Sequence, residues 1–225
     1  MLTKLYKIIR NSQNEVCWLS HHIPKTAGTS LANTYVNQFG KRNLYRLYNP
    51  DKIKVFERTG KIEQYTNELI VHGHFKPRVS QSNLSRDIRR IVWVRDPVQR
   101  AWSMLHHLVA VQKHKVEYRI LNDYFGEQLN QLNEDIFLFY LTDHRLKHLN
   151  RPYSNYFSEV PLMDFDFVGK VENYDSDLLK LSGLMGAQLG KEKRNIRKGK
   201  LSIDSQDFKC HLENEYEIMA NYYSY

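Results

Sequence analysis

The sequence predicts an α/β fold in which a central parallel sheet is flanked by helices. Short apolar segments of strand length alternate along the chain with longer segments whose apolar residues recur at helical spacing. This alternation is typical of parallel sheets that helices cover on both faces. No internal repeat and no linker rich in proline, glycine or serine divides the 225 residues, so we expect residues 1–225 to form a single domain.

Four apolar segments have the length and composition of strands: residues 16–23, 69–75, 90–94 and 165–170. Pro24 and Pro77 close the first two, and Arg95, Asp96 and Pro97 follow the third. Ligands of parallel sheets bind at the carboxyl ends of the strands. Three segments at such ends are therefore candidates for a functional site: residues 24–30, 72–76 and 95–103.

Helical patterns follow the first and third of these strands. The first pattern runs to about Phe39, where Gly40 predicts the end of the helix. The second begins with Asp96 as the predicted N-cap and Pro97 at the first helical position, and it continues through Leu108. Further helices are predicted at residues 123–141, 174–186 and 205–222.

The segment Pro24–Ser30 has the composition of an anion-binding loop. The first N–H groups of a helix lack acceptors within it, and the helix dipole places positive charge at the same point. Gly28 lets the backbone approach a phosphate closely, and Lys25 adds a full positive charge. The loop also carries Ala27 and three hydroxyl residues, Thr26, Thr29 and Ser30. An ordinary capped helix after a strand would share this pattern, and the Walker order of glycine before lysine is reversed here.

A second candidate phosphate site begins where the third strand ends. Arg95 leaves the strand, and Ser103 lies two turns along the next helix, on the same helix face as Arg100. A guanidinium and a hydroxyl suit a dianionic phosphate, because the guanidinium can bind two oxygens at once. An ion pair between Arg95 and a carboxylate, with Ser103 facing water, is the alternative interpretation.

The composition favours a soluble protein with anionic partners. The net charge of +8 and the pI of 9.3 suit nucleotides, nucleic acid, acidic sugars or acidic lipids without choosing among them. No segment reaches the roughly 20 apolar residues of a membrane span, and residues 1–15 lack the apolar core of a signal peptide. Cys17 and Cys210 cannot form a disulfide framework, which fits a reducing compartment. We expect a cytoplasmic location.

The two candidate phosphate segments together resemble the donor-binding motifs of sulfotransferases that use 3′-phosphoadenosine 5′-phosphosulfate (PAPS). The sequence I-P-K-T-A-G-T-S, ending at Ser30, is similar to their 5′-phosphosulfate loop, and R-D-P-V-Q-R-A-W-S, ending at Ser103, is similar to their 3′-phosphate motif. The resemblance extends to V-H-G-H-F at 71–75 and F-V-G-K-V-E-N-Y at 167–174. These segments look most like the carbohydrate branch, particularly the glycosaminoglycan uronyl 2-O-sulfotransferases.

This resemblance implies a P-loop-like, three-layer α/β fold with PAPS as the donor and a hydroxyl of a carbohydrate or related molecule as the acceptor. It implies that Lys25 and its loop hold the 5′-phosphosulfate, and that Arg95 and Ser103 hold the 3′-phosphate. A basic loop containing glycine, Arg197-Lys198-Gly199, would close over the nucleotide, although a solvated basic turn has the same composition. No metal, nucleic acid or membrane partner is expected.

His72 and His74 are the candidates for the general base, since alternate residues of a strand point to one face. A histidine near its free pKa of about 6.5 accepts a proton at neutral pH. In the resembling family this pair supplies the base, and His74 is favoured here because it lies nearer the strand end. Structural or metal-binding histidines would share the spacing, but no third ligand lies nearby at suitable spacing.

Other candidates for the base remain open at this point. Other sulfotransferase branches use a glutamate, and three glutamates lie upstream of the histidine pair: Glu57, Glu63 and Glu68. The side chains of the adjacent pairs His21–His22 and His106–His107 diverge in direction, so one of each pair can face the site, and the sequence does not choose between them.

Two other functions are weighed against sulfuryl transfer. A kinase-like phosphotransferase using ATP would need Mg²⁺ and acidic ligands for it at a strand end, where Asp96 is the obvious candidate. A non-catalytic protein that binds polyanions would use the positive charge alone and would show salt-sensitive binding without turnover.

Overall fold

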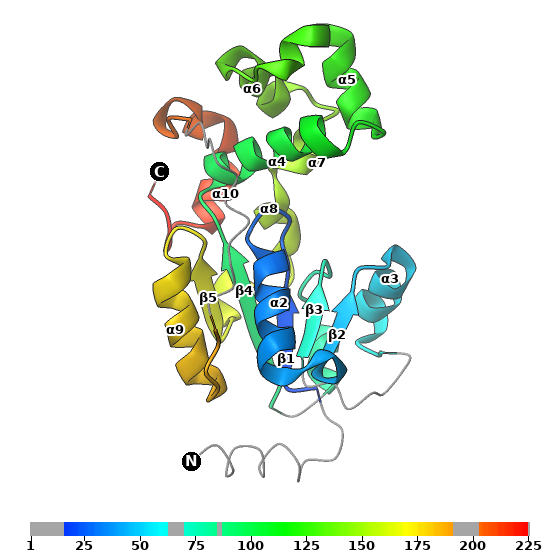
Figure 1. Ribbon diagram of the computed structural model, residues 1–225, viewed down its shortest axis with the longest axis vertical. Coiled ribbons are helices and arrows are strands. Elements are labelled where there is room, and N and C mark those ends of the chain that lie inside the picture. Colours follow the sequence, from blue (N-terminus) through cyan, green and yellow to red (C-terminus); the bar gives the residue numbers. More distant parts are fainter. Residues whose placement is uncertain (1–15, 63–69, 85–86, 191–202, 225) are drawn as a thin grey trace. The chain divides into compact units, whose positions relative to one another are not determined.

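The computed structural model describes residues 16–62, 70–84, 87–190 and 203–224. The chain falls into two compact units. The first, which we call the sheet unit, runs up to Val94 and resumes at Phe157; the second, the helical unit, takes Arg95–Tyr156 and the C-terminal segment. Figure 1 labels the helices and strands of both units.

The sheet unit contains five parallel strands in the order β2-β3-β1-β4-β5. Their bounds are β1 Trp18–His21, β2 Leu44–Leu47, β3 Ile70–Gly73, β4 Arg89–Val94 and β5 Phe167–Lys170. All four predicted strands are present, and the predicted α/β fold with a central parallel sheet is confirmed. The sequence analysis missed β2, a four-residue strand at the edge of the sheet.

Helices cover both faces of this sheet, as an α/β fold requires (Figure 1). They are α2 Gly28–Phe39, α3 Pro50–Thr59 and α9 Tyr174–Met185, with short 3₁₀ turns η1 Lys41–Asn43, η2 Val79–Leu84 and η4 Leu162–Asp164. Successive strand residues supply opposite faces. One buried cluster joins the sheet to α2 and α9 through Trp18, Leu31, Tyr35, Ile70, Trp93 and Leu178. The other joins it to α3 and η2 through Leu19, Leu47, Phe56, Val71 and Leu84.

The strand order places a topological switch at β1. The chain passes from β1 to β2 and β3 on one side of the sheet, then crosses to β4 on the other side. The register pairs His21 of β1 and Leu47 of β2 with the same residue, Gly73 of β3. Three neighbouring strands therefore end together, and ligands of such sheets bind at this kind of edge.

The helical unit packs helices around a separate apolar core that includes Leu105, Ile136, Phe137, Tyr140 and Tyr216. Its helices are α4 Pro97–Val111, α5 Val116–Phe125, α6 Glu134–Thr142, α7 Lys147–Asn150, α8 Pro152–Tyr156 and α10 Glu213–Ile218. The 3₁₀ turns are η3 Gly126–Asn130 and η5 Gln206–Leu212. The prediction for α4 is confirmed in detail: Pro97 is at its first turn, and the Asp96 side chain accepts a hydrogen bond from the Gln99 amide at 2.9 Å.

Two predicted helices were wrong in their extent. Residues 123–141 form the end of α5, the turn η3 and then α6, because Gly126 adopts φ of 50° and Asn133 caps a new helix by accepting from the Ile136 amide at 3.0 Å. Residues 205–222 form η5 and the short α10 instead of one long helix. Among the described residues, no helix has the length and apolarity that crossing a membrane requires.

Candidate functional site in the sheet unit

The loop between β1 and α2 is held in an unusual backbone conformation. Lys25 and Ala27 both have positive φ, 74° and 65°, which costs a non-glycine residue about 1–3 kcal/mol each and is found mainly at functional sites. The buried Thr26 stabilises this turn, because its hydroxyl donates to the Ile23 carbonyl at 2.7 Å. This hydroxyl, one of the three in the candidate anion-binding loop, therefore also shapes the loop itself. Alternating turn conformations of this kind direct successive N–H groups into an anion-binding concavity.

The loop leads directly into the N-terminus of α2. Ala27 is the N-cap and offers no side-chain cap, and the first turn contains no acidic residue. Positive charge from the helix dipole therefore meets no protein carboxylate in that turn. Thr29 is exposed and Ser30 is half-buried, so both lie where a bound anion could be contacted.

Gly28 allows close packing between this helix and the end of β1. A Cβ atom at this position would overlap the ring of His22. The glycine is thus needed for the fit of His22 as well as for any close approach of a ligand to the backbone. His22 follows the last residue of β1, and its ring lies against Gly28 in the segment Pro24–Ser30, which we call the anion loop after the composition described above.

His72 lies fully buried inside β3 and uses both ring nitrogens within the protein. Nε2 lies 3.2 Å from the Gly28 carbonyl, and Nδ1 lies 2.9 Å from the Ser20 hydroxyl. A carbonyl only accepts, so Nε2 carries the proton and Nδ1 accepts from Ser20. Burial is the largest effect on the pKa of His72 and lowers it from 6.5 to about 3, although the hydrogen bonds with Gly28 and Ser20 act to raise it. His72 therefore ties β3 to the start of α2 as a neutral ring.

His74 stands just beyond the end of β3, since the strand stops at Gly73. Its amide donates to the Leu47 carbonyl at 3.2 Å, and its Nδ1 donates to the His22 carbonyl at 2.7 Å. Because Nδ1 carries the proton, Nε2 of the neutral ring has the lone pair and can accept a proton. The ring is half-buried, and this burial lowers its pKa below 6.5 despite the hydrogen bond to His22.

The sequence did not choose between His22 and His21 for this site, and it gave no prediction for Tyr48. The His22 ring stacks on His74 at 4.4 Å between centroids, and its Nδ1 lies 3.0 Å from the Tyr48 hydroxyl. Its neighbour His21 points the other way, is buried, and bonds the Phe75 carbonyl through Nδ1 at 3.1 Å. Only the unpredicted strand β2 brings Tyr48 to this edge.

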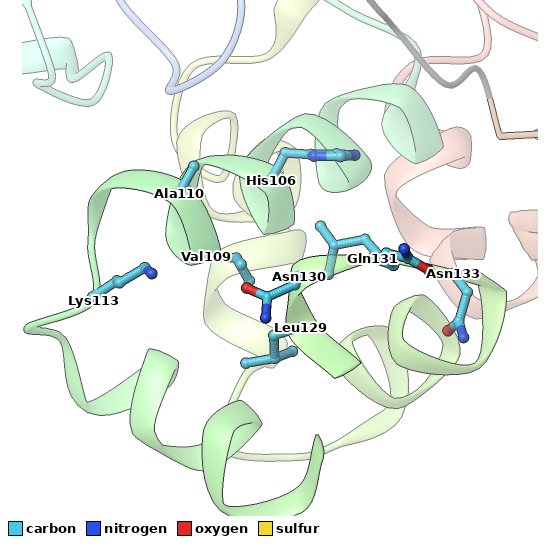
Figure 2. A pocket seen from close by; sticks show the side chains of 9 residues that line it. His106, Val109, Ala110, Lys113, Leu129, Asn130, Gln131 and Asn133 are labelled. Carbon is cyan, nitrogen blue, oxygen red and sulfur yellow. The ribbon is translucent and has the colours of Figure 1, made fainter. Parts of the chain in front are cut away.

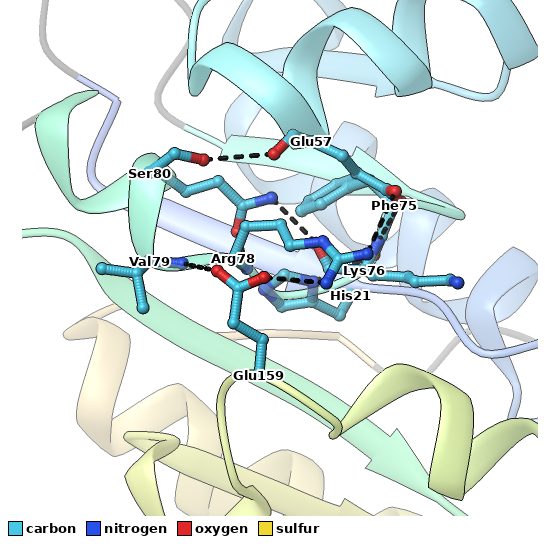
Figure 3. Close-up of polar contacts among 9 residues, drawn as sticks. His21, Glu57, Phe75, Lys76, Arg78, Val79, Ser80 and Glu159 are labelled. Carbon is cyan, nitrogen blue, oxygen red and sulfur yellow. Dashed lines mark hydrogen bonds and ion pairs between the residues drawn. The ribbon is translucent and has the colours of Figure 1, made fainter.

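Glu57, one of the alternative bases, belongs to a structural network (Figure 3). Its Oε1 accepts from the Lys76 amide at 2.6 Å, and its Oε2 lies 3.9 Å from the Arg78 guanidinium. Arg78 also forms an ion pair with Oε2 of Glu159 at 2.8 Å. The other carboxylate oxygen of Glu159 accepts from the Val79 amide. These contacts fix the segment that follows His74. Glu63 and Glu68 lie outside the described residues.

Arg95 and Ser103 lie in the helical unit. The backbone of Arg95 is fixed at both ends by the Tyr153 hydroxyl, which lies 2.9 Å from its amide and 2.6 Å from its carbonyl. Ser103 is half-buried on α4. Arg100, expected on the same face as Ser103, is buried and donates to the Leu149 carbonyl at 2.8 Å, so it stabilises the helical unit instead.

Asp96 serves the helical unit as a helix cap. Besides the Gln99 amide, its carboxylate accepts from the Tyr216 hydroxyl at 2.7 Å and from the Ser205 hydroxyl at 3.3 Å. These partners leave it poorly suited to bind Mg²⁺ as the kinase alternative requires. In the described ranges, no group of three histidine, cysteine or acidic side chains is placed to hold a metal ion. The loop Arg197-Lys198-Gly199 lies outside those ranges.

A pocket of about 690 Å³ also lies in the helical unit (Figure 2). Residues of α4 and of the segment before α6 line it: His106, Val109, Ala110, Lys113, Leu129, Asn130, Gln131, Leu132 and Asn133. Of the two histidines at 106 and 107, only His106 contributes to the lining. None of the residues predicted for donor binding or catalysis lines this pocket.

Comparison with known proteins agrees with the motifs. The model of the sulfotransferase family matches residues 7–217. Among solved structures, a sulfotransferase from Alicyclobacillus acidocaldarius matches with 12% identity and a TM-score of 0.48, over 92% of this chain and 95% of that chain. A search of curated proteins found no match. Because the family model covers nearly the whole sequence, the chain belongs to the sulfotransferase family, whose members transfer sulfuryl groups.

Proposed function

We propose that the protein transfers the sulfuryl group of PAPS to a hydroxyl of a carbohydrate or related acceptor, with His74 as the general base. One observation supports the proposal most directly: by the register of β1 and β3, His74, whose Nε2 can accept a proton, lies at the same edge of the sheet as the loop of residues 24–30 with its strained backbone. His74 is hydrogen-bonded to His22, whose ring in turn packs against Gly28 of the loop. Residues at one edge of the sheet could therefore both deprotonate a nucleophile and stabilise a leaving group.

The anion loop is assigned to the 5′-phosphosulfate of the donor. Lys25 supplies the charge, and the N-terminus of α2 supplies N–H groups from Gly28, Thr29 and Ser30. Thr26 and Ala27 give the loop its conformation, through the hydroxyl bond to Ile23 and the positive φ at Ala27.

The 3′-phosphate of the donor is assigned to Arg95 and Ser103, on the strength of their motif. Tyr153 holds the Arg95 backbone in place, and this limits the positions that the Arg95 guanidinium can reach. The loop Arg197-Lys198-Gly199 is assigned to closing over the nucleotide. On this proposal residues 1–225 act as one sulfotransferase domain, and the family match over 7–217 supports that extent.

The reaction follows from these assignments as an in-line transfer. The acceptor oxygen forms a bond to sulfur as its proton passes to Nε2 of His74. The bond between sulfur and the bridging oxygen breaks, and its electron pair remains on the 5′-phosphate. Lys25 and the start of α2 stabilise the negative charge that develops there. His72, buried and neutral, keeps β3 and the anion loop in register and takes no proton.

The donor assignment predicts a preference among nucleotides. Adenosine 3′,5′-bisphosphate, the spent donor, should bind far more tightly than AMP, because only the bisphosphate has the 3′-phosphate that Arg95 and Ser103 would bind. Titration calorimetry measures both affinities. Ser103→Ala should lower the affinity for the bisphosphate by about tenfold, because one hydrogen bond to a charged group is lost. The affinity for AMP should not change. Equal affinity of the parent protein for the two nucleotides would refute the 3′-phosphate assignment.

A further inference from the structure

The side chains of His22, Tyr48 and His74 meet because of strand register. Each is the first residue after its strand: His22 after β1, Tyr48 after β2 and His74 after β3. The three strands are neighbours, and Gly73 is paired with the last residue of both β1 and β2. We call these three residues the strand-end cluster.

Tyr48 contacts the other two members of the strand-end cluster directly. Its hydroxyl lies 3.0 Å from Nδ1 of His22, and its ring lies 4.8 Å from the His74 ring at an interplanar angle of 86°. The His22 ring in turn stacks on His74 at 4.4 Å and 27°. His74 therefore meets one aromatic ring edge-on and another face-to-face.

The surroundings of the strand-end cluster leave little room for these rings to move. A Cβ at Gly28 would overlap the His22 ring, and a Cβ at Gly73 would overlap the Leu47 carbonyl. The same Leu47 carbonyl accepts the His74 amide hydrogen at 3.2 Å. The backbone of His74 is thus fixed by Leu47, and its Nδ1 by the His22 carbonyl at 2.7 Å. The hydrogen bond between Tyr48 and Nδ1 of His22 adds a further contact to the ring that supports the face of His74.

We propose that Tyr48 is a positioning residue: by its hydrogen bond to His22 it holds the two stacked histidine rings in the orientation from which Nε2 of His74 reaches the acceptor hydroxyl. This inference rests on the proposed role of His74 as the base. A base acts only within hydrogen-bond reach of the proton it takes, and small misplacements of catalytic groups are costly in rate. Tyr48 itself remains a neutral phenol, because burial raises its pKa to about 12.

Several other groups act on the electrostatics of the strand-end cluster. The His72 ring lies 5.4 Å from the His22 ring between centroids. Burial is the main effect that lowers the pKa of His22, and His74, His72 and Lys25 lower it further. Burial is also the main effect that lowers the pKa of His72, and Arg46 of β2 acts in the same direction. Tyr48→Phe keeps the ring of Tyr48, which also lies 6.1 Å from the His72 ring between centroids. The aromatic ring of Tyr48 and its hydroxyl can therefore be tested separately.

Two substitutions separate the hydroxyl from the ring. Tyr48→Phe removes only the hydrogen bond to His22, and we expect turnover to fall about fivefold to tenfold. The acceptor KM, the bisphosphate affinity and the fall of activity at acid pH should stay as in the parent.

Tyr48→Leu removes the hydroxyl and also uncovers the His74 ring. The pKa of His74 should then rise toward the usual 6.5, so the acid limb of the pH–activity profile should move to higher pH. Tyr45→Phe, on the same strand, is the matched control and should match the parent.

A second measurement is independent of turnover. Nitrogen-15 chemical shifts of the histidine rings report which nitrogen carries the proton, and we expect His74 in the parent to be protonated on Nδ1 alone. In Tyr48→Phe the His22 and His74 resonances should shift or broaden, while those of the buried His21 should not. This readout remains valid if the protein proves to have no sulfuryl transfer, so the two proposals can fail separately.

Three results would overturn the role of Tyr48. Turnover of Tyr48→Phe within about twofold of the parent, with unchanged histidine resonances, would show that the hydroxyl does not position the rings. A raised acceptor KM at unchanged turnover would make Tyr48 an acceptor contact instead. Loss of bisphosphate affinity in Tyr48→Phe would show that the substitution disturbs the anion loop.

Discussion

Replacement of His74 with alanine is expected to lower turnover by about 10² to 10⁴, the usual contribution of a positioned general base. Bisphosphate affinity should remain close to that of the parent, because the Nδ1 hydrogen bond of His74 goes to the His22 carbonyl at the end of β1. Turnover measured at saturating PAPS, together with calorimetry, checks both expectations.

The pH profile of the parent gives a second test of the same residue. Burial lowers the pKa of His74 below 6.5, so the neutral, proton-accepting form persists to more acidic pH than it would for a free histidine. Activity should rise with pH through a midpoint below 6.5, instead of at the free value that the sequence alone suggested. His74→Ala should lack this limb.

Two other residues serve as controls for His74. His72→Ala should affect turnover less than His74→Ala, and its main effect should be on stability, since it removes the buried hydrogen bonds of His72 to the Ser20 hydroxyl and the Gly28 carbonyl. His144→Ala, at an exposed site in the helical unit, should behave as the parent. If His74→Ala kept both its turnover and the acid limb, histidine would be removed from the mechanism. Glu63 or Glu68 would then be the next candidate, since Glu57 is engaged with Lys76 and Arg78.

Replacement of Lys25 with methionine, which keeps the length of the side chain and removes its charge, is expected to lower turnover by about 10² to 10³, or about 3 kcal/mol of transition-state stabilisation. Charge on the leaving oxygen grows during the reaction, so the loss should appear in turnover more than in donor affinity. Single-turnover rates at saturating PAPS measure the effect.

Lys41→Met is the matched control for Lys25. Lys41 is an exposed lysine in η1 of the same unit, and its replacement changes net charge equally. A loss of turnover common to both variants would indicate a general electrostatic effect of the +8 chain instead of a local one. A change in donor affinity alone in Lys25→Met would make Lys25 a binding residue without a role in the chemical step.

The elements that the sequence predicted well have strong local signals at their ends. Pro24 lies three residues beyond the end of β1, Gly40 ends α2, and Asp96 with Pro97 starts α4; each acts through backbone geometry that depends on the residue itself. The edge strand β2 lacks such a signal, since it has four residues and an exposed Arg46 among them. Its neighbour α3 did carry one, the cap Asn49 followed by Pro50, which the sequence analysis overlooked.

The candidate site was predictable only where its residues belong to contiguous motifs. The anion loop and the V-H-G-H-F segment could be found because each is a run of adjacent residues. The contact of Tyr48 with His22 and His74 depends on the pairing of β2 with β3, which no local pattern specifies. The pKa of His74 likewise depends on burial by residues distant in sequence, so its direction emerged only from the packing.

The central claim is tested most directly by incubating the purified protein with PAPS radiolabelled in its sulfuryl group and a panel of carbohydrate and small hydroxyl acceptors. Sulfated and phosphorylated products have nearly equal mass, so the labelled donor identifies the reaction. We expect label to pass to a carbohydrate hydroxyl without added Mg²⁺, with release of adenosine 3′,5′-bisphosphate, and this transfer should nearly vanish in Lys25→Met and His74→Ala. Absence of transfer from PAPS to every acceptor, with Mg²⁺-dependent transfer from ATP labelled in its terminal phosphate, would contradict the claim.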